Sequence, residues 1–241
     1  GVFTSPYLER FNERISINGE DISNERLAVI TERVKEKIET MVKEGYEHPT
    51  TFEIVTTIAF VYFSEEDVDY TILEVGLGGR EDSTNIIENS YASVITTIDF
   101  DHTDVLGDTL GKIAYEKAGI IKENGLVISY PQEKEAFEVI EKIALEKKAK
   151  LIRCPMENVE IINLNQEGGI FNFKYKEYNF KNIKIELLGQ HQIYNATLAL
   201  MTMLILRDKG LIYLTNEQIK EGLEKTKWAG RLEVLKKNPT F

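Results

Sequence analysis

Cysteine, histidine and proline are scarce in this 241-residue chain, which has one Cys, three His and five Pro. A single cysteine excludes a disulfide framework and a zinc site built from several cysteines. We interpret the lone Cys154 as a packed structural residue. The chain also lacks an apolar run long enough to cross a membrane, and it has no secretory signal pattern. These absences predict a protein of the reducing cytoplasm.

Positive charge is in deficit as well. The chain has 29 Lys and Arg against 40 Asp and Glu, a formal net charge of −11, and a pI near 5.0. Because no basic stripe is present, this charge argues against non-specific nucleic-acid binding. Hydrophobic residues make up 42% of the chain, which is enough for one large α/β domain or two small ones.

Two short apolar runs, over residues 70–75 and 92–98, are rich in β-branched residues and end in loops of Gly, Asp, Thr and Asn. This pattern is typical of buried parallel strands. An open α/β sheet places its ligands just beyond the carboxyl ends of such strands. We therefore expect the functional site at these two strand ends, on neighbouring strands.

Polar side chains follow both runs. Glu74 closes the first, Asp99, Asp101 and His102 follow the second, and Lys117 comes one helix later. A carboxylate and an imidazole can share a hard cation, and such cations usually accompany nucleotide phosphates. A carboxylate that closes a buried strand needs a partner, either a metal or a lysine. Both residues also have an interpretation without a metal. His102 could be a solvent-exposed turn residue, and Lys117 could be a counter-charge to the helix dipole.

The rest of the chain predicts an α/β fold class, with a mostly parallel sheet flanked by helices and a small appended antiparallel sheet. The antiparallel insert spans about residues 157–188, where period-two alternation surrounds the Gly168-Gly169 turn. A short ribbon is predicted over 10–21, around the Asn18-Gly19 turn. Strands are predicted over 126–129 and 151–153, and helices over 23–44, 52–63, 109–117, 134–147, 190–209 and 215–226.

Polar groups crowd the start of the helix that follows Thr50. Glu53 there could favour the helix dipole or contact a ligand, and both interpretations stay open. The glycine-rich loop 76–80 does not have the G-x-G-x-x-G spacing of a dinucleotide site. Its glycines indicate instead that some group approaches the backbone closely.

Three further polar residues lie near the carboxyl end of the chain. His191 and Asn195 are four residues apart on one helix face, which favours hydrogen bonding to a ligand or to another helix. Arg231 is a candidate phosphate ligand, although an arginine in a linker is usually solvated. Taken by themselves, the residues indicate an α/β domain for a phosphate ligand with a Mg²⁺ site, and no particular reaction.

Six blocks in consistent order resemble the folylpolyglutamate synthases and their dihydrofolate synthase relatives, a branch of the Mur ligase superfamily. The blocks are FTSPYLERFNERISING from Phe3, TTFE from Thr50, ILEVGLGGREDSTN from Ile72, ITTIDFDHTDVLGDTLGKIAYEKAGIIK from Ile95, LLGQHQIYNATLAL from Leu187 and WAGRLE from Trp228. Six blocks are far more specific than any one loop. The family usually has His at the position of Tyr7 and commonly Ala at that of Ser83.

The resemblance implies an ATP-dependent carboxylate–amine ligase with the Mur-ligase central fold. ATP would phosphorylate the carboxylate of a folate or of dihydropteroate, and the amine of L-glutamate would attack the acyl phosphate. By the same resemblance, Ser5 and Glu74 bind one Mg²⁺, His102 binds a second, and Lys117 is a carbamylated metal ligand. His102 and Lys117 would be the catalytic pair. The nucleotide would contact Asn195, His191 and Arg231, and the pterin side would be lined by Thr50, Phe52, Glu53, Asp82 and Ser83.

The resemblance also predicts the domain organisation. Residues 1–226 would form the central ATP-binding domain, and residues 227–241 a linker to a further domain. The family's phosphate-binding loop, G-T-N-G-K-G-S, belongs before the first block and is absent, so we expect the 241-residue chain by itself to be inactive. A monomer is expected. Two alternatives stay open: a Mur-type ligase for another acid, and a nucleotide- and metal-binding module without ligase activity.

Overall fold

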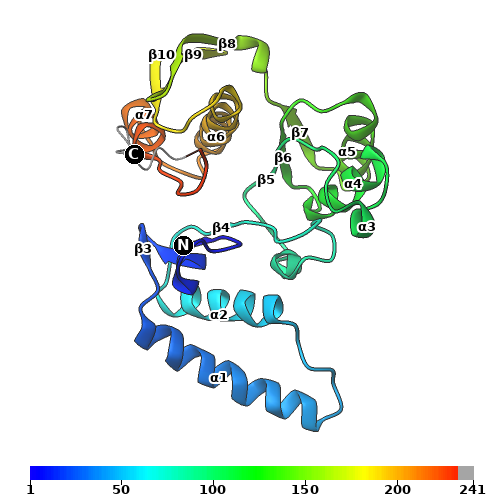
Figure 1. The fold of residues 1–241 in the computed structure, drawn as a ribbon. Helices are drawn as coiled ribbons and strands as arrows, with labels where there is room; N and C mark the ends of the chain where they lie inside the picture. Colours follow the sequence, from blue (N-terminus) through cyan, green and yellow to red (C-terminus); the bar gives the residue numbers. More distant parts are fainter. Residues whose placement is uncertain (233–241) are drawn as a thin grey trace, which may run out of the picture. The chain divides into compact units, whose positions relative to one another are not determined.

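The computed structural model describes residues 1–232 and contains two compact units, Gly1–Glu88 and a second that begins at Asn89 (Figure 1). Each unit is described by itself. Of the linker predicted over 227–241, residues 227–232 contain no helix or strand, and residues 233–241 lie outside the described residues. The single central domain predicted over 1–226 stays a prediction.

The first unit contains a four-stranded sheet with the order β3-β2-β1-β4. β2 and β3 form the predicted ribbon, and the turn between them places Asn18 and Gly19 at φ of 53° and 84°. β1 pairs antiparallel with β2 and parallel with β4, so β4 is an edge strand. The strands are β1 (Val2–Phe3), β2 (Ile15–Ile17), β3 (Glu20–Asp21) and β4 (Ile72–Leu73).

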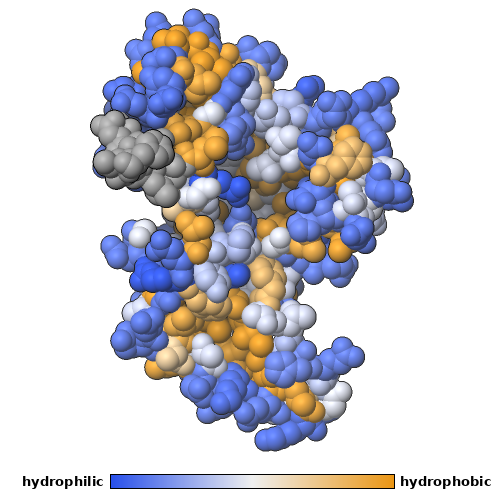
Figure 2. Space-filling view, in the orientation of Figure 1, coloured by the Kyte–Doolittle hydropathy of each residue, from blue (hydrophilic) through white to orange (hydrophobic). Residues whose placement is uncertain are grey.

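Two helices, α1 (Asn24–Lys43) and α2 (Thr51–Glu65), pack together against the core of this sheet (Figure 1). Both begin at capping residues, because the Ser23 and Thr50 side chains each accept a hydrogen bond from the third backbone N–H that follows. A groove of about 350 Å³ runs between the two helices. Figure 2 shows hydrophobic surface over this part of the unit, rimmed by hydrophilic residues.

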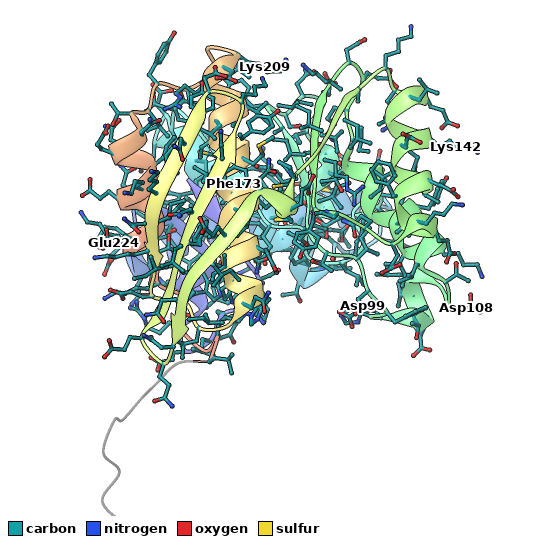
Figure 3. All side chains as sticks on the ribbon, turned by 90° about the horizontal axis from the view of Figure 1, so that it is seen from above. Asp99, Asp108, Lys142, Phe173, Lys209 and Glu224 are labelled. Carbon is teal, nitrogen blue, oxygen red and sulfur yellow. The ribbon has the colours of Figure 1, made fainter. Side chains whose placement is uncertain are left out.

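The second unit is layered around the parallel sheet β5-β6-β7, with strands Ser93–Ile95, Leu126–Ser129 and Lys150–Arg153. α4 (Leu110–Lys117) and α5 (Lys134–Glu146) cover one face, and α6 (Gln190–Asp208) packs on the other face of the central strand. The α6 layer separates this sheet from a second, antiparallel sheet (Figures 1 and 3).

Successive residues of β6 point into different cores. Leu126 and Ile128 belong to the core that α6 shares with the antiparallel sheet, whereas Val127 belongs to the core under α4 and α5. All three side chains are buried. The period-two alternation of a strand thus explains why β6 is apolar at every one of these positions.

The antiparallel sheet confirms the predicted insert. Its order is β10-β9-β8, and the hairpins turn near Gly168 and at Lys176. Phe173 of β9 is buried against the α6 core, and Figure 3 labels it on this sheet. The strands of this sheet are β8 (Val159–Asn165), β9 (Gly168–Tyr175) and β10 (Tyr178–Ile185), and helix α7 (Asn216–Lys225) covers it.

The short helices of the two units are η1 (Phe11–Arg14), η2 (Ser83–Ile86), α3 (Thr103–Leu106), η3 (Ala118–Ile120) and η4 (Met156–Asn158).

The structure corrects the predicted arrangement of two strands. The apolar runs 70–75 and 92–98 do not form neighbouring strands of one sheet, because β4 belongs to the sheet of the first unit and β5 to the parallel sheet of the second. Neither run is buried throughout. Ile72 on edge strand β4 is 64% exposed, since only β1 pairs with that strand. Among residues 1–232, no helix is both long and apolar enough to traverse a bilayer.

Replacing Gly168 by alanine is expected to destabilise the insert. A Cβ at Gly168 would lie 1.9 Å from the carbonyl oxygen of Ile185, and its φ of +125° is unfavourable for any side chain. We expect G168A to lower the free energy of unfolding by about 1–3 kcal/mol or more, measured by urea denaturation. The control is G222A on α7, where a Cβ has open space, and it should be neutral or slightly stabilising. Equal stability of G168A and the unchanged chain would contradict the prediction.

The thiol of Cys154 should be unreactive in the folded protein. Cys154 is fully buried, its Sγ lies 4.0 Å from the Thr197 carbonyl oxygen, and burial raises the pKa of the thiol to about 12. Because the thiolate is the reactive form, alkylation by iodoacetamide at pH 8 should proceed only after unfolding in urea. Rapid labelling of the native protein, followed by mass spectrometry, would show this account of the thiol to be wrong.

Candidate functional site

Two predicted metal ligands of the first unit are in direct contact. Glu74 follows β4, and its Oε2 accepts a hydrogen bond of 2.8 Å from the backbone N–H of Ser5. The other carboxylate oxygen has no hydrogen-bond partner among residues 1–232. Glu74 is exposed, so the expectation of a buried strand-closing carboxylate is wrong, because the short edge strand ends before it. An exposed carboxylate with one open oxygen is nevertheless suited to a hard cation.

Asp82 holds the glycine-rich loop in place. Its Oδ2 accepts hydrogen bonds from the backbone N–H groups of Gly76 and Leu77, at 2.9 and 3.0 Å. Its Oδ1 accepts from the N–H and the hydroxyl of Thr84, at 2.9 and 2.5 Å. Ser83 follows directly as the first residue of η2, which Asp82 caps. Both oxygens of Asp82 are therefore occupied by the protein's own donors, and this gives Asp82 a positioning role for the segment after Glu74.

Phe52 closes on the same loop from the other side. A Cβ at Gly76 would lie 2.5 Å from Cζ of Phe52, so only glycine allows the ring this close to the backbone. The Phe52 ring also contacts Phe3 of β1, with ring centroids 5.9 Å apart. The predicted close approach to the glycine loop is thus made by an aromatic side chain of the chain itself.

Thr50 and Glu53 form a reciprocal capping box at the start of α2. The Glu53 carboxylate accepts hydrogen bonds from the Thr50 N–H at 2.6 Å and from the Thr50 hydroxyl at 2.8 Å. The Thr50 hydroxyl in turn accepts from the Glu53 N–H. These bonds hold the pKa of Glu53 below its usual range. Of the two roles left open for Glu53, the structure shows the structural one.

His102 occupies a strained position at the start of α3. Its backbone lies in the left-handed region at φ 48°, and its carbonyl accepts from the N–H groups of Val105 and Leu106. The side chain is 61% exposed, and Nε2 lies 3.7 Å from a carboxylate oxygen of Asp101. Figure 3 shows the neighbouring Asp99 at the same end of the second unit as Asp108, which precedes α4. A left-handed histidine on an exposed loop is the kind of strain that functional sites retain.

Lys117 is the last residue of α4 and is half-buried. No hydrogen bond or ion pair joins its amine to any residue in the part of the chain that the structure describes. Its position fits a counter-charge to the helix dipole, and the open amine also fits the predicted carbamylation. Within residues 1–232, no three His, Cys, Asp or Glu side chains gather closely enough to hold a metal. The predicted ligand set, which relies on Ser5 and Lys117 as well, stays a prediction.

His191 and Asn195 both lie exposed on the first turns of α6, as their spacing predicts. Asn195 Nδ2 donates to Gln192 Oε1 at 3.2 Å, and the His191 ring folds back over Gly189, where a Cβ would lie 2.6 Å from its Cε1. Gly189 gives this helix no side-chain cap. Arg231 is exposed in the final described turn.

Two residues that hold site loops were missed from the sequence. Glu13 accepts hydrogen bonds from the N–H groups of Leu8, Glu9 and Arg10, which hold its pKa below the usual range. It thereby fixes the loop after Ser5. Gln132 bonds to the backbone that leaves β5. Glu13 could have been found from its capping spacing to Arg10, but no local pattern indicates the long-range contact of Gln132.

Comparison with known proteins finds a family and relatives that this chain resembles. The profile of the Mur ligase middle domain matches residues 24–203. A dihydrofolate synthase/folylpolyglutamate synthase of Bacillus subtilis is 39% identical over 99% of this chain and 56% of the relative. The folylpolyglutamate synthase structure of Thermotoga maritima is 36% identical with a TM-score of 0.87, covering 99% of this chain and 54% of that one.

A solved folylpolyglutamate synthase complex with AMPPCP and folate is also similar. It is 30% identical with a TM-score of 0.91, over 98% of this chain and 58% of that one. The α/β fold predicted from the sequence is thereby confirmed, including the parallel sheet and the appended antiparallel sheet. The chain spans somewhat more than half the length of each of these relatives.

Replacing Asp82 by alanine is expected to loosen the glycine loop. D82A removes the acceptor of four hydrogen bonds and the cap of η2, so the first unit should lose at least about 1 kcal/mol of stability. Hydrogen exchange of the Gly76 and Leu77 amides should accelerate. The neighbouring E81A, which removes an exposed carboxylate, is the control and should change neither quantity. Unchanged amide exchange in D82A would contradict the positioning role.

Proposed function

Because the chain belongs to the Mur ligase middle-domain family, we propose that it is the central part of an ATP-dependent ligase that adds L-glutamate to folates. The observation that carries the proposal is 39% identity to a dihydrofolate synthase/folylpolyglutamate synthase over almost the whole chain. The similarity to a folylpolyglutamate synthase complex with AMPPCP and folate supports both the nucleotide and the acceptor. Domain boundaries at 1–226, a monomeric state and a cytoplasmic location belong to the same proposal.

The proposed reaction has two steps. The carboxylate of the folate attacks the γ-phosphorus of ATP, which forms an acyl phosphate and releases ADP. The amine of glutamate then attacks the acyl carbon, an amide bond forms, and inorganic phosphate leaves. Activation is needed because a free carboxylate is a poor electrophile, and the acyl phosphate supplies a good leaving group. Tetrahydrofolate and dihydropteroate are the two candidate acceptors.

The residues present fit Mg²⁺ by donor chemistry. The open oxygen of Glu74 beside Ser5 is a hard ligand of the kind that Mg²⁺ prefers, and the exposed His102 ring has no hydrogen-bond partner in residues 1–232. We propose Ser5 and Glu74 as ligands of one ion and His102 as a ligand of a second. When bound, Mg²⁺ neutralises charge on the phosphate oxygens.

Lys117 is proposed to act as a carbamate. Addition of CO₂ to its amine would replace a cation by an anionic group with two oxygens, which Mg²⁺ binds better than it binds nitrogen. Support comes from the amine itself, which makes no ion pair within the described chain, and from its half-buried site at the end of α4. Uptake of CO₂ requires a neutral, accessible amine.

The other roles concern the nucleotide and the acceptor. We propose Asn195, His191 and Arg231 for the nucleotide, supported by the exposed polar start of α6. The acceptor side would be lined by residues that also hold the loop, namely Thr50, Phe52, Glu53, Asp82 and Ser83. Both oxygens of Asp82 and one oxygen of Glu53 accept hydrogen bonds from the protein's own donors, so these two residues would shape the acceptor site through the loop and helix that they fix.

Phosphate release tests the proposal. The protein that carries this chain would be given ATP, Mg²⁺ and glutamate with either tetrahydrofolate or dihydropteroate. We expect release with tetrahydrofolate, and release with both would assign a bifunctional synthase. H102A should lower kcat by at least about a hundredfold, whereas the control H48A, at an exposed loop histidine, should not. A folded protein that binds ATP yet releases no phosphate with either acceptor would refute the assignment and favour a different Mur-type ligase or a binding module.

A further inference from the structure

Gln132 lies in the short connection between β6 and α5, and its side-chain amide bonds twice to the chain that leaves β5. Its Oε1 accepts a hydrogen bond of 2.9 Å from the N–H of Ile98, and its Nε2 donates one of 2.8 Å to the carbonyl of Thr96. In a parallel sheet, a residue donates its N–H to the carbonyl of the residue before its cross-strand partner, and its carbonyl accepts from the N–H of the residue after that partner. Gln132 makes the same pair of bonds with its side chain. The side chain of Gln132 therefore acts as a substitute for one strand residue facing Thr97.

The backbone ladder between β5 and β6 ends just before this contact. The register pairs Ile95 with Ser129, so two positions further along Thr97 corresponds to Pro131. The last backbone bond of this ladder runs from the N–H of Tyr130 to the carbonyl of Ile95, at 2.8 Å. Beyond that bond, the side-chain amide of Gln132 makes the next contacts with the chain that leaves β5.

These two bonds decide where the loop with His102 leaves the sheet. Over residues 96–101 they are the only hydrogen bonds that tie the backbone to another element within the described chain. The next backbone bonds are local: the Phe100 N–H donates to Asp99 Oδ1, and the bonds after it belong to α3, which starts from the strained φ of His102. Ile98, the residue that Gln132 holds, is buried, while Phe100 and His102 are exposed.

We propose that Gln132 is a positioning residue that fixes residues 98–102 and thereby places His102 for metal binding. The second half of this statement rests on the proposed function, in which His102 binds Mg²⁺. Because a side chain and not a strand holds Thr96 and Ile98, the chain can turn away from the sheet directly after Ile98. A backbone partner would instead extend the strand toward Asp99 and His102, where the loop must turn.

The test compares two glutamines whose side chains both bond to backbone groups, in the protein that carries this chain. Q132M keeps the size of the side chain and removes both bonds, and the control Q218M removes a side-chain bond of 2.8 Å to the Thr215 N–H in the cap of α7. Two quantities are measured: hydrogen exchange of the Ile98 amide without nucleotide, and the Mg²⁺ concentration that gives half the maximal rate of phosphate release.

Q132M should accelerate exchange at Ile98 on the order of tenfold and raise the half-saturating Mg²⁺ concentration about as much, with a smaller effect on kcat at saturating Mg²⁺. Q218M should leave both quantities unchanged. Unaltered exchange at Ile98, or an equal shift in Q218M, would overturn the proposal. If Q132M does not fold, Q132N takes its place, because its amide is one methylene shorter and can reach at most one of the two backbone groups.

H102A separates this proposal from the proposed function. If H102A leaves the Mg²⁺ requirement unchanged, the role of His102 in the proposed function fails, and exchange at Ile98 still decides whether Gln132 fixes the loop. If H102A raises the requirement and Q132M does not, Gln132 is structural only and the positioning of His102 is refuted.

Discussion

The side chains of β6 alternate between two hydrophobic cores, and the architecture of the second unit depends on this division. Val127 faces the helices α4 and α5, while Leu126 and Ile128 face α6 and the antiparallel sheet behind it. A strand covered on both faces cannot accept a polar residue at any of these positions without an unpaired group. The polar chemistry of the unit is consequently confined to the strand ends, and His102 lies in the loop that follows β5.

Loops at strand ends have backbone groups that no sheet satisfies, and this protein satisfies many of them with side chains. Asp82 binds the N–H groups of the glycine loop after β4, Glu13 binds those of the loop after β1, and Gln132 binds the exit of β5. Each of these side chains is fixed by two or more hydrogen bonds. Such loops can stay irregular, which ligand sites require, without leaving their donors unpaired.

Several residues that were expected to bind a ligand also form structural contacts of this kind. Thr50 and Glu53 cap α2, and Phe52 between them closes on Gly76. A helix start that presents polar groups to a ligand must itself be held rigidly, since a small displacement there would move every group at once. Residues of one sequence block can therefore serve the acceptor through the geometry that they impose.

The sequence by itself determined the elements whose cause is local. The caps at Ser23, Thr50 and Thr109 and the alternation around Gly168-Gly169 depend on residues a few positions apart, so α1, α2, α4 and the antiparallel sheet were predicted close to their observed bounds. The family also followed from the sequence, because six ordered blocks carry it.

Only the tertiary structure decided which strands pair and what the polar side chains touch. The apolar runs around β4 and β5 look alike in sequence, yet they belong to different sheets, because pairing depends on partners far away along the chain. Glu74 was expected to be buried and is exposed, since the burial of a residue at a strand end depends on whether another strand lies beside it. Gln132 lies 34 residues from Ile98 in the chain, and only the folding of β5 onto β6 brings that amide to the backbone it holds.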